Sequence, residues 1–198
     1  MPWVTWRIRA NSGKQVFLTF DDGPTRELTG PLIEVLAQYN AKATFFCIGQ
    51  KVKKNRDQFR GIVEAGHLIG NHSLSHLNGW NTSAKAHVAD VLQCQEILSD
   101  ELGYAPKYFG PPFGRISVRQ LFQLRKRFEV VLWDILSMDY RQELTGEQVA
   151  RNVSENVRPG SIVVFHDSDL TKDRVTVALP IILEHLSENG FQMCKLDQ

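Results

Sequence analysis

The stretch VFLTFDDGPTRELTGPLIEVLAQYNAKATFFCI, residues 16–48, contains a complete strand–helix–strand unit. Residues 16–20 and 43–48 are apolar and rich in aromatic side chains, which is typical of buried strands. Between them, residues 27–39 carry apolar side chains at helical spacing. Strands that alternate with helices in this way build parallel sheets, so the stretch predicts an α/β fold.

The same alternation continues along the rest of the chain. Further strands are expected at residues 67–70, 107–109, 130–133, 162–165 and 191–195, and further helices at residues 58–65, 84–102, 118–128, 146–157 and 175–189. The pattern gives seven strands in a single domain at residues 16–198, preceded by an N-terminal arm at residues 1–15. Such a chain forms either a closed barrel or an open doubly wound sheet, and periodicity does not choose between them.

The composition narrows the choice of partner and compartment. Lys and Arg number 23 and Asp and Glu 22, so the net charge of +1 creates no field that attracts a polyanion, and nucleic acid is not expected as a partner. No apolar run reaches the ~18–20 residues of a membrane span. The first residues lack the charged-then-apolar order of a secretory signal, so we expect a cytoplasmic protein unless a targeting segment has been removed. Cys47, Cys94 and Cys194 lie far apart and are expected to be buried apolar residues.

Polar residues follow four of the predicted strands. In barrels and in open α/β sheets alike, ligands bind at the carboxyl ends of the strands, so these residues are candidates for a functional site. The four strand ends carry Asp21-Asp22, Asn71-His72, the tetrapeptide PPFG at 111–114, and His166-Asp167.

The first strand ends in two adjacent carboxylates, Asp21 and Asp22. Their mutual repulsion is unfavourable at the mouth of a packed strand unless a cation or a proton compensates it. The pair therefore indicates a metal site with one acid left for proton transfer. The segment DDGP also suits a solvated turn in which Asp22 caps the next helix, and the tetrapeptide alone does not decide between the two.

His72 and His76 have the spacing of two ligands for one cation. On one helical turn their imidazoles would share a face, and with one carboxylate they would leave positions open for water and substrate. Histidines at this spacing also occur on ordinary surfaces, because the pattern is short. The remaining histidines outside the strand ends, His67, His87 and His185, are expected to be core or surface residues without a ligand role.

His166 ends the apolar run IVVFH at residues 162–166. A histidine at a strand mouth near a metal is suited to protonate a leaving group, with a neighbouring acid that fixes its tautomer and pKa. The competing interpretation is a histidine whose hydrogen bonds are satisfied by the following turn.

Five motifs together resemble the polysaccharide deacetylase, or NodB-homology, family, carbohydrate esterase family 4. They are TFDDGP at 19–24, HSLSH at 72–76, PPFG at 111–114, WDILSMDY at 133–140 and VFH at 164–166. The resemblance extends from residue 16 to the end of the chain. It implies a distorted (β/α) barrel of about seven parallel strands and a metal-dependent hydrolase that removes N-acetyl, or O-acetyl, groups from an acetylated poly- or oligosaccharide.

The resemblance also implies roles for individual residues. Asp22, His72 and His76 would hold a divalent metal, usually Zn²⁺ and otherwise Co²⁺ or another divalent ion. Asp21 would be the general base that activates the attacking water, and His166 the general acid for the leaving amine.

Further roles follow from the same resemblance. The backbone N–H of Phe113 would bind the oxyanion, and Asp139 would be the partner acid of His166. Trp133, Leu136 and Val164 would form the pocket for the acetyl methyl group, although ordinary core packing explains these three equally well.

The chain departs from the family pattern at two places. Gly110 stands where the third motif usually has an arginine that contacts the base, and Arg115 is the nearby residue that would reach back to Asp21 in its place. In the fourth motif, Leu136 and Ser137 stand where many members have an acid. Such losses weaken the support of catalytic groups.

Two other functions stay open at this point. A family member with weakened support could bind metal or glycan without turnover, and an O-acetyl esterase acting on xylan or another glycan would use the same residues. Chitin oligomers, peptidoglycan and acetylated xylan are all candidate substrates, because loops that vary freely select the glycan.

Overall fold

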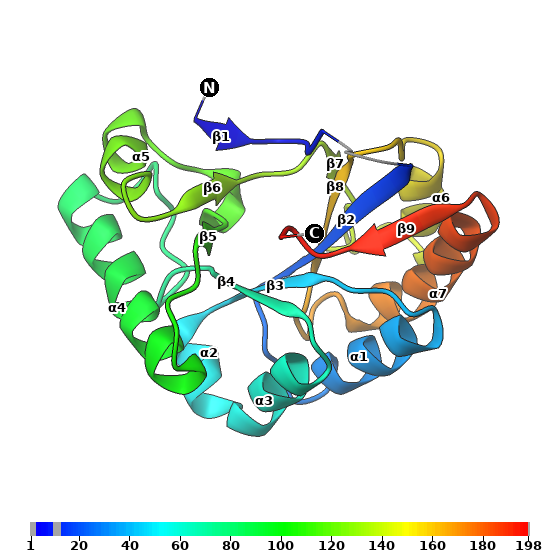
Figure 1. Cartoon of the computed structure of the whole chain (residues 1–198), viewed down its shortest axis with the longest axis horizontal. Helices are drawn as coiled ribbons and strands as arrows, with labels where there is room; N and C mark the ends of the chain where they lie inside the picture. The colour runs from blue at the N-terminus through cyan, green and yellow to red at the C-terminus, as the bar shows by residue number, and fades with distance from the viewer. Residues whose placement is uncertain (1–2, 10–12, 198) are drawn as a thin grey trace.

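A computed structural model describes residues 3–9 and 13–197 of the chain (Figure 1). The strands of this part are β1 (Val4–Thr5), β2 (Lys14–Asp21), β3 (Thr44–Cys47), β4 (Leu68–Asn71), β5 (Tyr108–Phe109), β6 (Glu129–Val131), β7 (Ile135–Leu136), β8 (Ile162–His166) and β9 (Phe191–Cys194). They form one sheet in the order β1-β6-β5-β4-β3-β2-β8-β7, with β9 paired to β2. Every strand pairing is parallel.

Helices surround the outside of this curled sheet (Figure 1). They are α1 (Thr29–Gln38), α2 (Gly49–Lys54), α3 (Arg56–Glu64), α4 (Ala84–Leu102), α5 (Val118–Leu124), α6 (Gly146–Ser154) and α7 (Lys172–Glu188), with a short 3₁₀ helix, η1 (Pro112–Gly114), after β5. The expected α/β fold, a distorted barrel of parallel strands in a single domain, is confirmed.

The chain between β6 and β8 gives the barrel its distorted shape. β6 pairs with β5, but β7 begins only a few residues later and pairs with β8, so one continuous segment joins the two sides of the sheet. The N-terminal residues bridge the same gap, because Thr5 O accepts from Leu132 N at 2.8 Å and Ile8 N donates to Gly160 O at 2.9 Å. The strands therefore curl around a common interior, and their carboxyl ends converge.

All seven strands expected from the sequence are present. The structure adds β1 and β7, which have two residues each and are too short to show a period. It also adds α2, a helix of six residues that directly follows β3. Elements this short contain too few residues for a sequence pattern to predict them, and they form because of the tertiary structure around them.

Aromatic packing between the sheet and the surrounding helices supports the strand ends that carry the site. The ring of Phe20 stacks on Phe45 and Phe165 with centroids 5.0 and 5.4 Å apart, and all three side chains are fully buried. Burial of each such ring stabilises the fold by roughly 1.5–3 kcal/mol. Because Phe20 directly precedes Asp21 in β2, this packing fixes the end of the strand from which the carboxylates project.

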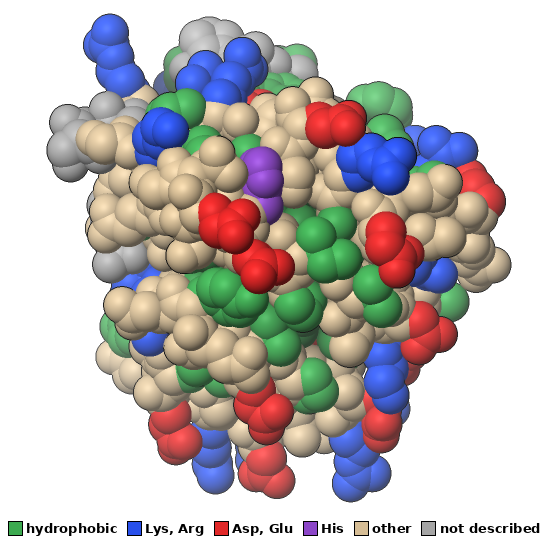
Figure 2. Space-filling view, turned by 90° about the vertical axis from the view of Figure 1, so that its right-hand side faces the viewer, with side chains coloured by type: hydrophobic (Ala, Val, Ile, Leu, Met, Phe, Trp, Pro, Cys, Tyr) green, Lys and Arg blue, Asp and Glu red, His purple; other side chains and the backbone are tan. Residues whose placement is uncertain are grey.

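The three cysteines are free and buried, as expected, and burial raises the pKa of the Cys94 thiol to about 12. No helix in the described part is long and apolar enough to cross a membrane. Figure 2 shows the face formed largely by α6 and α7, where small hydrophobic patches lie between acidic and basic side chains.

Candidate metal and acid–base site

The turn after β2 carries the first two site residues. Asp21 is buried, with 5% of its surface exposed, and Asp22 adopts a left-handed backbone with φ of 75°. An aspartate tolerates this conformation better than most residues, so the chain can reverse directly after the strand. The expected turn is present, but it is not a solvated loop, because both carboxylates face inward toward histidines.

Asp167 anchors this turn, a role that the sequence analysis missed. Its buried carboxylate accepts hydrogen bonds from the hydroxyl groups of Thr25, at 2.6 Å, and Thr29. Its backbone N–H donates to Asp21 O at 2.7 Å, which joins β8 to β2. Gly23 makes the approach possible, since a Cβ there would lie 2.3 Å from Asp167 Oδ2. Burial raises the pKa of Asp167 to about 6, even though both threonines lower it.

The expectation that His72 and His76 share one helical turn is wrong. Residues 72–76 form an irregular loop, with positive φ at Ser73 (65°) and His76 (59°). The two rings nevertheless lie with their centroids 5.1 Å apart. The loop brings the imidazoles together by a tight local turn, which i and i+4 spacing alone cannot distinguish from a helix.

Polar contacts from α4 and β4 hold this loop in place. Asp90 on α4 accepts from the backbone N–H of Leu74 at 2.9 Å and from the Ser75 hydroxyl at 2.6 Å. Asn71 Oδ1 accepts from Ser73 N at 2.8 Å. Neither supporting role was anticipated, and that of Asp90 depends on how α4 packs against the loop.

Asp22, His72 and His76, the three candidate metal ligands, lie close together. One side-chain donor atom from each lies within 4.8 Å of the others, as the sequence predicted. The Nε2 atoms of His72 and His76 lie 3.4 and 3.0 Å from Asp22 Oδ1. That oxygen is buried and has no hydrogen-bond partner among the described residues.

The tautomer of His72 explains this unpartnered oxygen. His72 Nδ1 lies 2.8 Å from the carbonyl of Gly110, which can only accept, so Nδ1 carries the proton. A neutral His72 then presents the lone pair of Nε2 to Asp22 Oδ1, and only a proton or a cation between them relieves the contact. Imidazole nitrogens with one carboxylate oxygen are the donor set that Zn²⁺ prefers, so the residues fit a divalent metal.

The two carboxylates respond differently to this environment. Burial raises the pKa of Asp21, and positive charge on His72 only partly opposes the rise. Burial would also raise the pKa of Asp22, but the facing imidazoles of His72 and His76 outweigh it and hold that pKa far below its usual range. Asp22 is therefore suited to bind a cation and Asp21 to exchange a proton.

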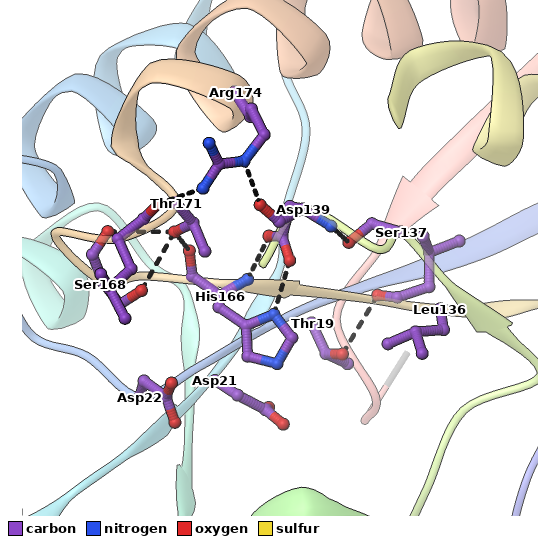
Figure 3. A network of polar contacts seen from close by, with 12 residues as sticks. Thr19, Asp21, Asp22, Leu136, Ser137, Asp139, His166, Ser168, Thr171 and Arg174 are labelled. Atoms are coloured by element: carbon purple, nitrogen blue, oxygen red, sulfur yellow. Dashed lines mark hydrogen bonds and ion pairs between the residues drawn. The ribbon is translucent and has the colours of Figure 1, made fainter. Parts of the chain in front are cut away.

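A second group of residues surrounds His166 at the end of β8 (Figure 3). Asp139 is fully buried and accepts two bonds from it, from Nδ1 at 2.6 Å and from the backbone N–H at 2.7 Å. Burial alone would lower the pKa of His166, but the bond to Asp139 and the nearby carboxylates raise it to about 9. Arg174 on α7 donates from Nε to the Asp139 carbonyl at 2.5 Å and also bonds Leu170 O.

One cavity of about 380 Å³ joins these two groups. It is lined by Asp21, Asp22, His72, His76, Phe113, Arg115, Trp133, Leu136, Tyr140, His166, Ser168, Leu170 and Thr171. Trp133 and Leu136 are at the wall, as predicted, whereas Val164 is completely buried in β8 and is not part of it. The sequence analysis missed Tyr140 and the residues that follow His166, although their position after a predicted strand was a usable signal.

Phe113 lies beside the metal ligands. Its ring packs on His76 with centroids 4.5 Å apart and is 56% exposed, and its backbone has φ of 59°. The oxyanion role of its N–H stays a prediction. The remaining histidines lie outside the ligand cluster, and His67 Nδ1 accepts from Ala43 N at 3.3 Å.

The first departure from the family pattern, Gly110 in place of an arginine, has a structural counterpart. A Cβ at Gly110 would lie 3.0 Å from the ring of Phe46, so a side chain there would press on the core. Arg115 does not reach back to Asp21, because its guanidinium carbon lies 5.0 Å from the centroid of the Trp80 ring. In the part of the chain that the structure describes, no hydrogen bond or ion pair joins Arg115 to Asp21, so the predicted orienting role has no contact to support it.

Comparison with known proteins gives a consistent picture. The family described as polysaccharide deacetylase matches residues 9–129. A peptidoglycan-N-acetylglucosamine deacetylase of Bacillus cereus is 35% identical over 171 residues, which cover 84% of this chain and 62% of that protein. A second Bacillus cereus protein of the same description is 32% identical over 200 residues, covering 99% and 92%. The chain thus spans less than two thirds of the first relative and nearly all of the second.

A solved structure shares the whole fold. The crystal structure of the Bc1960 peptidoglycan N-acetylglucosamine deacetylase in complex with 4-naphthalen-1-yl-N-oxidanyl-benzamide superposes with a TM-score of 0.92 at 31% sequence identity. The match covers 98% of this chain and 90% of that one.

Proposed function

This chain belongs to the polysaccharide deacetylase family, and from that premise we propose that it is a divalent-metal-dependent hydrolase that removes N-acetyl groups from the amino sugars of a glycan. The observation that carries the proposal is the buried, unpartnered Oδ1 of Asp22 between the Nε2 atoms of His72 and His76. A cation satisfies all three donors at once. Two further ionisable groups, Asp21 and His166, line the same cavity.

The residues would divide the work as follows. Asp22, His72 and His76 would hold a divalent cation, whose charge would make a bound water more acidic and polarise the acetyl carbonyl. Asp21 accepts the proton of the attacking water. Its raised pKa supports this role, because a base whose pKa lies closer to neutrality holds the proton more effectively.

The leaving amine needs a proton from the other side of the cavity. His166 donates it from Nε2, because Nδ1 is held by Asp139 at 2.6 Å. The pKa of about 9 keeps His166 protonated at neutral pH, as an acid requires. The side chains of Trp133 and Leu136 offer an apolar wall to the acetyl methyl group.

Two relatives that carry the name peptidoglycan-N-acetylglucosamine deacetylase support a more specific substrate. We propose that the acetyl group removed is that of N-acetylglucosamine in a glycan of the peptidoglycan type. The amide bond makes a general acid such as His166 useful, since an amine leaves poorly without a proton.

The test is acetate release from three glycans, namely chitooligosaccharides, peptidoglycan and acetylated xylan, with Zn²⁺ or Co²⁺ added. Release from the first two supports an N-deacetylase. Release from xylan alone identifies an O-acetyl esterase, and metal binding without release from any glycan identifies a binding protein. His166→Ala should retain metal and lose amide cleavage more than cleavage of an activated ester.

A further inference from the structure

Arg115 places a positive charge in the cavity, and the proposed mechanism gives this residue no role. It is the one Lys or Arg among the residues that line the cavity, all of which the structure describes. We propose that Arg115 and Trp80 form a subsite that binds a carboxylate on the sugar next to the acetylated one. The inference rests on the proposed function and specifies its substrate further.

The contacts of Arg115 leave its hydrogen-bonding edge available. Its guanidinium lies against the ring of Trp80, with 5.0 Å between the guanidinium carbon and the ring centroid. Within the described ranges, the ion pairs of the protein do not include Arg115. A cation–π contact uses the face of the guanidinium and fixes its plane, while the N–H groups stay free to bind an anion.

The loop that carries Trp80 is fixed against Arg115. A Cβ at Gly79 would lie 2.3 Å from Arg115 O, so only a glycine permits the two backbones to approach this closely. The buried amide of Gln120 donates to Gly79 O at 2.8 Å and to Thr82 O at 3.1 Å. The subsite is therefore built before a ligand arrives, which lowers the entropy lost on binding.

The remaining charges in the cavity determine what Arg115 can bind. Asp21 and Asp22 face His72 and His76, and neither pairs with Arg115. The anion that complements the guanidinium must then come from the substrate. A carboxylate suits the planar fork because it accepts two parallel N–H bonds. Arg115 and the residues proposed to hold the metal line the same cavity, so the carboxylate lies close to the reacting sugar. N-acetylglucosamine, the reacting sugar of the proposed function, has no carboxylate, so the carboxylate belongs to the sugar adjacent to it.

The experiment compares three substrates that differ in this carboxylate. They are peptide-free glycan strands of alternating N-acetylglucosamine and N-acetylmuramic acid, the same strands with their carboxylates converted to amides, and neutral N-acetylglucosamine oligomers. The metal-loaded protein should prefer the acidic strands over the amidated ones. Arg115→Gln should reduce that preference about tenfold, mainly through KM, because a charge-assisted bidentate contact is lost.

Arg119→Gln is the matched control, because Arg119 is an exposed arginine on α5 that lines a separate groove. It should keep the preference of the unmodified protein. Equal use of acidic and amidated strands by the unmodified protein would overturn the subsite. So would an Arg115→Gln variant that keeps the preference, or one that loses kcat equally on all three substrates.

Binding separates this inference from the proposed function. Calorimetry with the metal-loaded Asp21→Asn variant measures affinity for acidic and amidated strands without turnover. Tighter binding of the acidic strand, lost in Asp21→Asn/Arg115→Gln, supports the subsite whether or not acetate is released. Acetate release from the N-acetylated glycans together with equal binding of both strands supports the deacetylase and rejects the subsite.

Discussion

The metal-ligand half of the site and the acid half satisfy their polar atoms in opposite ways. Asp22 Oδ1 is buried and has no hydrogen-bond partner in the described part of the chain, and the Nε2 atom of His72 lies 3.4 Å from it. His166 and Asp139, in contrast, are joined by two hydrogen bonds of 2.6 and 2.7 Å. Both halves rise from ends of the same parallel sheet, so the fold does not cause the difference.

The difference indicates what each half needs in order to work. Two hydrogen-bond acceptors that face each other in a buried site, such as Asp22 Oδ1 and His72 Nε2, repel each other unless a positive charge lies between them. The metal-ligand half is therefore incomplete without a cation or a proton. The acid half is complete, because its carboxylate already fixes the ring and the proton of its histidine. We therefore expect the first half to depend on an added ion and the second on its internal hydrogen bonds.

Loss of the cation should have the largest effect. Asp22→Ala, or chelation of the native protein, should reduce acetate release by a factor on the order of 1000 or more, because the activating charge is removed. Zinc or cobalt should restore the chelated protein but not the variant. Metal content and acetate release are measured together, with the exposed Asp169→Ala as control. Full turnover by metal-free protein would contradict the proposal.

Asp21→Asn should have the next largest effect. The variant should keep its metal and lose turnover by a factor on the order of 100, as expected when a positioned proton acceptor is removed. Metal analysis tests whether Asp21 is a metal ligand, and kcat tests whether it is the proton acceptor. If the variant loses its metal instead, Asp21 is a ligand, and the two halves differ less than the structure indicates.

Asp139→Asn should weaken the acid half without changing the metal-ligand half. The pKa of His166 should fall from about 9, and turnover should fall about tenfold. NMR titration of the ring in metal-free protein measures the pKa directly. Asp134→Asn is the control, since Asp134 accepts bonds from Ser161 and Ile162 away from the histidine.

The same change should alter the pH dependence of stability. The folded pKa of His166 is raised from 6.5 to about 9, so protonation stabilises the fold fully below pH 6.5, and this contribution is lost as pH rises through about 9. Denaturant unfolding of metal-free protein at several pH values should show that loss. Asp139→Asn should reduce it, and an unchanged pH dependence would show that Asp139 does not control the histidine.

Arg174→Gln should have the smallest effect. Arg174 bonds the backbone carbonyl of Asp139, at 2.5 Å, and not its carboxylate, so its loss should lower turnover a few-fold and leave metal content unchanged. A shift of the alkaline limb of the pH–rate profile to lower pH would show that the effect passes through His166. Lys172→Gln is the control on the same helix, because Lys172 pairs with the distant Glu27 at 3.2 Å. A shift of equal size in the control would argue for a general effect on α7.

The sequence predicted the strands and the grouping of Asp22, His72 and His76 because both depend on local pattern. Seven apolar runs marked seven strands, and the parallel arrangement placed Asp22 and His72 at the same edge of the sheet. The same reasoning misjudged the loop around His76, since positive φ values at two positions leave no trace in residue spacing. Val164 was misplaced for a different reason. It lies two residues before His166 and so on the same face of β8, but it is completely buried and does not line the cavity, and the period of a strand does not show how deep a side chain lies.

By itself, the sequence determined the α/β class, the carboxyl-end location of the site and the identity of its candidate ligands. Only the tertiary structure decided which groups support them. Asp90, Asp167 and Arg174 each act on residues far away along the chain, through hydrogen bonds that form once the sheet has curled. The tertiary structure also decided that the Arg115 side chain lies against Trp80. That contact depends on the close packing of two loops, in which the backbone of Gly79 meets the backbone of Arg115. Local pattern reflects the period of a strand or helix, whereas such contacts depend on the three-dimensional path of the chain.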